Sequence, residues 1–201
     1  MFFYKGLLIG FAIAAPVGPI GLLCIQRTLT RGRLAGLASG LGAASADAVY
    51  GFVAGFGLTA VSGLLLGWRR ELQLLGGLFL LYLGLRILLA PPAEGRAAAA
   101  SVGLLSDYAS TFVLTLANPV TILAFIGIFT GLGLADAPGD FISAGLLVLG
   151  VFLGSLLWWL LLASGVGALR HRLAPAVQGW INRAAGAVII SFGVLATAGG
   201  A

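Results

Sequence analysis

One acidic residue stands in the middle of a long apolar stretch of this 201-residue chain, and its position suits it to chemistry. Asp47 lies in the segment Ser-Ala-Asp-Ala-Val-Tyr, residues 45–50, roughly 20 Å into a predicted helix at 1.5 Å per residue. An ionisable group at that depth in a membrane points to function by default. Because burial favours the protonated carboxyl, Asp47 is predicted to exchange a proton or to bind a substrate's ammonium group. A structural aspartate, bonded to hydroxyls such as that of Ser45, is the alternative.

Two proline-containing interruptions lie about one hundred residues apart, each inside an apolar segment. Proline removes an amide donor and obstructs the carbonyl one turn earlier, so each stretch predicts a broken helix. A matched pair of broken helices in two halves of a chain points to the binding site of a transporter. Ordinary proline kinks that shape a helix bundle are the alternative. The residues concerned are Pro16, Gly18, Pro19 and Gly21 in the first interruption, and Asn118, Pro119 and Thr121 in the second.

The two interruptions supply chemistry that complements Asp47. A helix that restarts inside the membrane presents free amides and the positive end of its dipole, which suits a carboxylate. An amino acid carries both a carboxylate and an ammonium group, so these amides together with Asp47 would match its two ends. Asn118 is predicted to cap the helix that restarts at Pro119, and it could also contact substrate. Tyr50 and Trp158 are candidates for the lining of the same cavity, and side-chain packing is the alternative role for both.

The composition indicates an integral membrane protein. Hydrophobic residues make up 60% of the chain and charged residues 8%, whereas soluble domains average about 25% charged. The net charge of +5 comes from arginines in short predicted loops, so it indicates topology rather than nucleic-acid binding. The single cysteine, Cys24, gives no disulfide framework or cysteine cluster, and no metal or cofactor is expected.

The positions of the apolar segments predict an all-α fold of six transmembrane helices. Three spans in each half mean that the second half enters the membrane from the opposite side, which is an inverted repeat. Gly77 and Gly84 are seven residues apart in the third span, as are Gly186 and Gly193 in the sixth. We expect one transmembrane domain with repeat one at residues 1–90, a cytoplasmic linker at 91–107 and repeat two at 108–201. The predicted spans are residues 2–26, 34–66, 72–89, 108–134, 141–167 and 180–199.

The distribution of basic residues predicts the orientation. If both termini are outside the cell, eight of the eleven lysines and arginines lie on the inner side and three on the outer side, as the positive-inside rule requires. The inner set is Arg27, Arg31, Arg33, Arg86, Arg96, Arg170, Arg172 and Arg183.

These motifs together resemble the lysine exporter family of amino acid translocators, LysE/RhtB. The resemblance rests on Ala-Pro-Val-Gly-Pro in the first span, residues 40–50 ending in Ser-Ala-Asp-Ala-Val-Tyr, and Leu-Ala-Asn-Pro at residues 116–119, and it covers nearly the whole chain. It implies a secondary active exporter of amino acids or related small metabolites from a bacterial cytoplasm, driven by protons across the inner membrane. Family members that export lysine or arginine tend to follow Gly-Pro with Gln-Asn, whereas this chain has Ile20-Gly21, which argues against a basic substrate.

The expected partners are therefore an amino acid substrate, protons and the lipid bilayer, with a homodimer as a candidate assembly and no nucleic acid. Two other classes of function stay open. A heavy-metal exporter of the cadmium type would need thiol, thioether or imidazole ligands inside the spans, where the sequence offers Cys24. An intramembrane enzyme would need a catalytic cluster, and the one histidine, His171, lies between arginines in a predicted loop.

Overall fold

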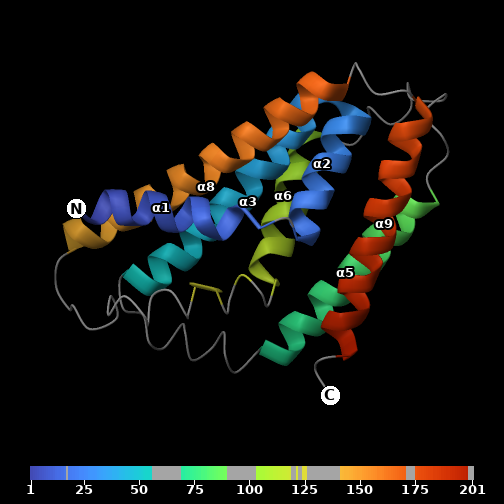
Figure 1. Ribbon diagram of the computed structural model, residues 1–201. Coiled ribbons are helices and arrows are strands. Elements are labelled where there is room, and N and C mark those ends of the chain that lie inside the picture. The colour runs from blue at the N-terminus through green and yellow to red at the C-terminus, as the bar shows by residue number, and fades with distance from the viewer. Residues whose placement is uncertain are drawn as a thin grey trace.

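The computed structural model describes residues 1–16, 18–55, 69–89, 103–118, 121, 124–125, 141–170 and 175–198. All the regular structure of these residues is α-helical (Figure 1), as the composition predicts. The helices are α1 (Phe2–Ala14), α2 (Pro19–Arg31), α3 (Arg33–Gly55), α5 (Arg69–Leu88), α6 (Leu104–Leu116), α8 (Phe141–Arg170) and α9 (Pro175–Ala198).

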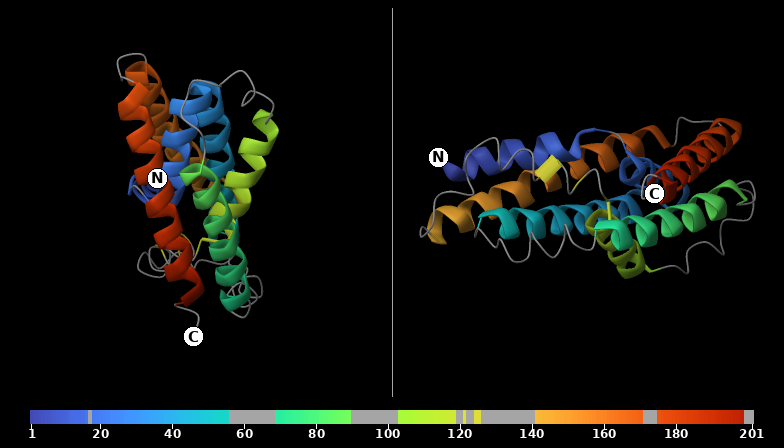
Figure 2. Two further views of the ribbon diagram at one scale, coloured as in Figure 1. Left: turned by 90° about the vertical axis from the view of Figure 1, so that its right-hand side faces the viewer. Right: turned by 90° about the horizontal axis from the view of Figure 1, so that it is seen from below.

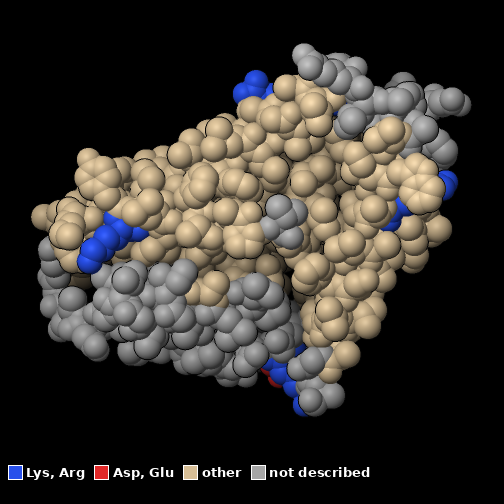
Figure 3. All heavy atoms as spheres, in the orientation of Figure 1, with Lys and Arg blue, Asp and Glu red and all other residues tan. Residues whose placement is uncertain are grey.

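The lengths and compositions of these helices fit a multi-pass membrane protein. Among the described residues, α8 and residues Gly179–Ala198 of α9 are each long and apolar enough to cross a membrane, and the bent pair α1 and α2 qualifies as one further span. Apolar side chains such as Leu105, Ile142 and Leu161 lie exposed on the outside. Lys and Arg take up little of the face shown in Figure 3. Parts of the predicted second and fourth spans, residues 56–66 and 126–134, lie outside the described residues.

The helices form two groups with a connecting pair between them. α1, α3 and α8 pack together on one side, and α5 packs along α9 on the other, with α2 and α6 between the groups (Figures 1 and 2). α1 runs parallel to α8, since Gly6 faces Leu147 and Gly10 faces Val151. α3 runs antiparallel to α8, since Gly36 faces Ala163 and Gly51 faces Val151. This arrangement brings the middle of α3, where Asp47 lies, against the middle of α8.

Glycines permit the closest helix contacts. On α1 and α8, Gly6 with Gly10 and Gly150 with Gly154 each form a G-x-x-x-G pattern, and a methyl group at any of the four would overlap backbone of the facing helix. Small residues at this spacing let membrane helices approach to backbone contact.

The four glycines that the sequence singled out in the third and sixth spans meet one another. A methyl group on Gly77 would lie 3.0 Å from the carbonyl oxygen of Gly193, and one on Gly84 would lie 3.0 Å from that of Gly186. In the other direction, a methyl group on Gly193 would lie 2.9 Å from the carbonyl oxygen of Gly77, and one on Gly186 would lie 3.0 Å from that of Gly84. α5 and α9 therefore cross antiparallel with the two glycine pairs facing each other.

The structure corrects the predicted loop between the first two spans. Arg27 and Arg31 belong to α2, and Gly32 alone separates that helix from α3. Gly32 has φ of +101°, a left-handed conformation that glycine adopts without steric cost. The predicted linker, residues 91–107, lies outside the described residues up to residue 102, and its last four residues belong to α6.

Candidate functional site

The first predicted helix break is present in the structure. α1 ends at Ala14, α2 begins at Pro19, and the two helices are bent by 77°. Gly18 is the N-cap residue in an extended conformation, and Pro19 takes the first helical position, where its missing amide removes no hydrogen bond. The next two amides, of Ile20 and Gly21, belong to the first turn and have no acceptor within the helix. They provide the free donors that the sequence predicts at this break.

The second predicted break coincides with the end of a helix. α6 ends at Leu116, and the amide of Asn118 donates to the carbonyl of Thr115 at 3.2 Å in a closing turn. Pro119 lies outside the described residues. Asn118 and the buried Thr121 therefore lie just beyond the end of α6.

A chamber of about 380 Å³ lies where these two segments meet α3, α8 and α9. Its volume is within the range of small-molecule sites, roughly 300–1,000 Å³. Six residues predicted from the sequence line it together with Asp47, which brings both interrupted segments and the acid to one cavity. The described lining residues are Ala12, Ile13, Ala14, Pro16, Gly18, Pro19, Ile20, Gly21, Asp47, Thr115, Asn118, Thr121, Ala124, Trp159 and Phe192.

Asp47 is held on the chamber wall by a short chain of hydrogen bonds. Its side chain is buried, and the hydroxyl of Ser155 on α8 donates to Oδ2 at 2.6 Å. The indole Nε1 of Trp159, one turn further along α8, donates to the Ser155 oxygen at 3.1 Å. Among the described residues, Ser155 is the one hydrogen-bond partner of this carboxyl. The second carboxylate oxygen is thus left for a proton or for a cationic group.

Three details differ from the sequence-based expectations. Ser45 does not bond Asp47, because its hydroxyl donates to the carbonyl of Leu41 in its own helix at 2.8 Å. Tyr50 does not line the chamber, since its hydroxyl donates to the carbonyl of Leu116 and its ring stacks on Phe125. Trp158 packs edge-to-face on Phe11 and is not among the described lining residues of the chamber.

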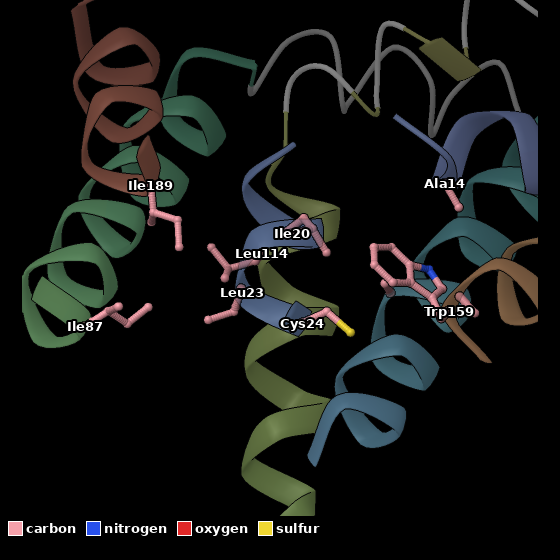
Figure 4. Close-up of a cluster of buried hydrophobic side chains, with 10 residues drawn as sticks. Ala14, Ile20, Leu23, Cys24, Ile87, Leu114, Trp159 and Ile189 are labelled. Carbon is pink, nitrogen blue, oxygen red and sulfur yellow. The ribbon is translucent and has the colours of Figure 1, made fainter. Parts of the chain in front are cut away.

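The chamber wall also contains residues that the sequence did not single out. Trp159 rather than Trp158 lines it, and Figure 4 shows the indole of Trp159 between Ile20 of α2 and Ala14 of α1. Thr115 is buried with its hydroxyl oxygen unpartnered among the described residues, and Phe192 contributes an aromatic ring from α9. Ser155 and Trp159 are one helical turn apart, and this spacing is the sequence signal that could have predicted their hydrogen bond.

The described part of the wall has one carboxylate and no histidine, cysteine or methionine. Nor do the described residues contain a group of three or more His, Cys, Asp or Glu side chains arranged to hold a metal ion. Soft metals such as cadmium prefer thiolate, thioether or imidazole ligands. Cys24, the thiol available in the chain, is buried and donates to the carbonyl of Gly36 at 3.3 Å, away from this chamber.

Comparison with known proteins gives two matches. The family model described as LysE type translocator matches residues 11–200. The chain is 28% identical over 196 residues to the "Putative amino acid efflux protein YcgF" of Bacillus subtilis (strain 168), an alignment that covers 95% of this chain and 92% of that protein. No solved structure matches the chain significantly.

Proposed function

The chain belongs to the LysE type translocator family, and from that premise we propose that it exports amino acids from a bacterial cytoplasm by proton-coupled alternating access. The observation that carries this proposal is the chamber, because it joins Asp47 to the free amides at the start of α2. The similarity to an amino acid efflux protein of Bacillus subtilis supports the same substrate class. The protein would lie in the inner membrane with both termini outside, as the arginine distribution predicts.

The two ends of an amino acid match two parts of the chamber wall. The amides of Ile20 and Gly21 and the positive end of the α2 dipole would bind the carboxylate. Asp47 would bind the ammonium group through the oxygen that Ser155 does not engage. Pro16, Gly18 and Pro19 fix the bend that exposes those amides. Asn118 and Thr121 add hydrogen-bonding groups beside them.

Asp47 is also the group proposed to couple export to protons. A buried carboxyl that loses its proton must gain a compensating cation or water. Binding of a substrate ammonium to the ionised form and of a proton to the empty form would therefore be mutually exclusive. That exclusivity is what antiport of amino acid and proton requires.

The packing of the helices supports two inverted repeats. α6 runs parallel to α3, since Gly42 faces Tyr108 and Tyr50 bonds Leu116. This contact corresponds to the parallel contact of α1 with α8 in the other half, while α5 and α9 cross antiparallel at their own glycine pairs. We propose the repeat boundaries predicted from the sequence, residues 1–90 and 108–201. The broken first span and the end of α6 at Leu116 then occupy equivalent positions in the two repeats.

The chamber favours amino acids with neutral, apolar side chains. Beyond the polar groups already assigned, its described wall consists of residues such as Ile13, Trp159 and Phe192, and Asp47 is the one charged residue among the described lining. A second charge on the substrate would be buried without a partner, which costs several kcal/mol. Even a part of that cost separates substrates clearly, because 1.4 kcal/mol corresponds to a tenfold difference in binding affinity.

The experiment is export from sealed vesicles. Purified protein is reconstituted into liposomes loaded with all twenty amino acids, a pH gradient is imposed, and the released amino acids are measured by mass spectrometry. We expect valine, leucine, isoleucine and phenylalanine to leave at least about tenfold faster than lysine, arginine, aspartate and glutamate. Release of every amino acid at the rate of protein-free liposomes would contradict the exporter itself. Release of lysine or glutamate as fast as leucine would contradict the apolar selectivity alone.

A matched pair of variants locates the selectivity. Phe192→Asp places a carboxylate in the chamber wall and should raise lysine export relative to leucine by about tenfold, a gain that misfolding cannot produce. Phe192→Asn places a neutral amide of the same shape at the same position in the wall and should leave the ratio unchanged, because it adds no charge. If Phe192→Asp exports leucine and still excludes lysine, Phe192 does not face the substrate side chain.

A further inference from the structure

A second buried polar cluster lies outside the chamber and joins α2, α3 and α6. The guanidinium of Arg27 donates from Nη1 to Ser39 on α3 at 2.9 Å, and to the Asp107 carbonyl at 2.9 Å and Thr111 at 2.8 Å on α6. Its Nη2 donates to Ser110 at 2.8 Å. One arginine therefore cross-links three helices.

The same cluster contains an ion-pair triad. Oδ1 of Asp107 lies 3.4 Å from Nε of Arg27 and also pairs with Nη2 of Arg31. The side chains of Asp107, Arg27 and Arg31 are 1%, 9% and 16% exposed. Two guanidinium groups thus share one carboxylate in a mostly dry site. The other oxygen, Oδ2 of Asp107, is buried and has no hydrogen-bond partner among the described residues.

The cluster lies about 9–12 Å from the chamber along each of the three helices. Arg27 follows the chamber residue Gly21 by about 9 Å along α2, and Asp107 precedes Thr115 by about 12 Å along α6, at 1.5 Å per residue. Ser39 precedes Asp47 by the same 12 Å or so along α3. The three helices therefore converge from the chamber toward one end of the bundle, which the arginine distribution predicts to be cytoplasmic.

An apolar layer separates the chamber from the cluster. Leu23 and Cys24 of α2, Leu114 of α6 and Ala43 and Ala44 of α3 are buried together. Figure 4 shows Leu23 and Leu114 on the side of α2 that faces Ile87 and Ile189, with Cys24 on the opposite side of α2. A path from the chamber to this end of the bundle is closed twice, first by this layer and then by the charged cluster.

We propose that Arg27, Arg31 and Asp107 form an ion-pair gate that closes the chamber toward the cytoplasm and opens when substrate is taken up. Buried ion pairs gain in mutual attraction about what they lose in hydration, so a gate of this kind can open at little net cost once water reaches it. The unpartnered Oδ2 of Asp107 gains hydration on opening, which favours a two-state element over a permanent joint. The inference rests on the proposed function for the identity of the substrate that passes the gate.

The native cysteine provides the test. Cys24 is fully buried between the chamber and the cluster and is the one cysteine of the chain. In inside-out membrane vesicles, a membrane-impermeant maleimide should label wild-type Cys24 slowly. Asp107→Asn keeps the side-chain shape but removes the negative charge that pairs with Arg27 and Arg31, so we expect labelling at least about tenfold faster from the cytoplasmic face.

A second cysteine distinguishes gating from loss of structure. Ala144→Cys, made in a Cys24→Ser background, is buried on α8 away from the cluster and should stay protected when Asp107→Asn is added. If Asp107→Asn leaves the labelling rate of Cys24 unchanged, the gate is contradicted. Faster labelling at both position 24 and position 144 contradicts it as well. Opening at Cys24 in a protein that exports no amino acid would contradict the proposed function and leave the gate standing.

Discussion

Asp47→Asn is expected to reduce proton-driven amino acid export to the rate of protein-free liposomes. Asparagine keeps the shape of the side chain and can still accept the hydrogen bond from Ser155, so the fold and membrane insertion should be retained. It cannot take up a proton at this position or neutralise an ammonium group. The measurement is release of radiolabelled leucine from reconstituted vesicles under an imposed pH gradient, with gel filtration in detergent as the check on folding.

Ser45→Ala is the matched control for that experiment. Ser45 lies two residues from Asp47 on the same helix and is bonded within that helix to Leu41, so its loss should change export little. Coupled export that persists in Asp47→Asn would rule out the proposed role of the carboxyl. Equal losses in both variants would instead show that this part of α3 tolerates no substitution.

Gly154→Ala is expected to destabilise the protein because it forces α1 and α8 apart. The new methyl group would overlap the carbonyl oxygen of Leu7, a backbone atom that cannot move without its helix. Overpacking of this kind costs about 1–3 kcal/mol, which lowers the midpoint of thermal unfolding by roughly 2–12 °C for a chain of this size. Ser155 follows directly on α8, so the hydrogen bond to Asp47 should be disturbed and export should fall as well.

Gly145→Ala on the same helix is the control. A methyl group there meets nothing within 4 Å, and alanine is a better helix former than glycine by about 1 kcal/mol. Thermal unfolding in detergent should therefore show an unchanged or raised midpoint. If Gly154→Ala and Gly145→Ala lower the unfolding midpoint equally, α1 and α8 do not pack as closely at Gly154 as the structure shows.

The chamber could be predicted from the sequence because its main signals are local. Pro16, Pro19 and Asn118 interrupt apolar segments, and Asp47 is an acid in a segment with few charges. Each of these features is visible in a window of a few residues. The helix bend at Gly18 and the lining by Asp47 then follow from the same physical rules that made the residues conspicuous.

The details that sequence reasoning missed depend on partners far along the chain. The sequence predicts Arg27 in the loop between the first two spans, whereas Asp107, eighty residues later, lets it be buried in α2. The choice between Trp158 and Trp159 could not be made either, because α8 is apolar on all sides. Neighbouring residues on a helix point in directions about 100° apart, so the packing of α8 on α3 decides which ring reaches the chamber.

The most direct test of the central claim is protection of a chamber cysteine by substrate. Ala12 lines the chamber on α1 and is exposed, so Ala12→Cys in a Cys24→Ser background gives a reactive thiol at the site. Arg70→Cys, exposed at the start of α5 and outside the described lining, is the control. We predict that saturating leucine slows maleimide labelling at position 12 and leaves labelling at position 70 unchanged. Equal labelling at position 12 with and without leucine would contradict the assignment of this chamber as the amino acid site.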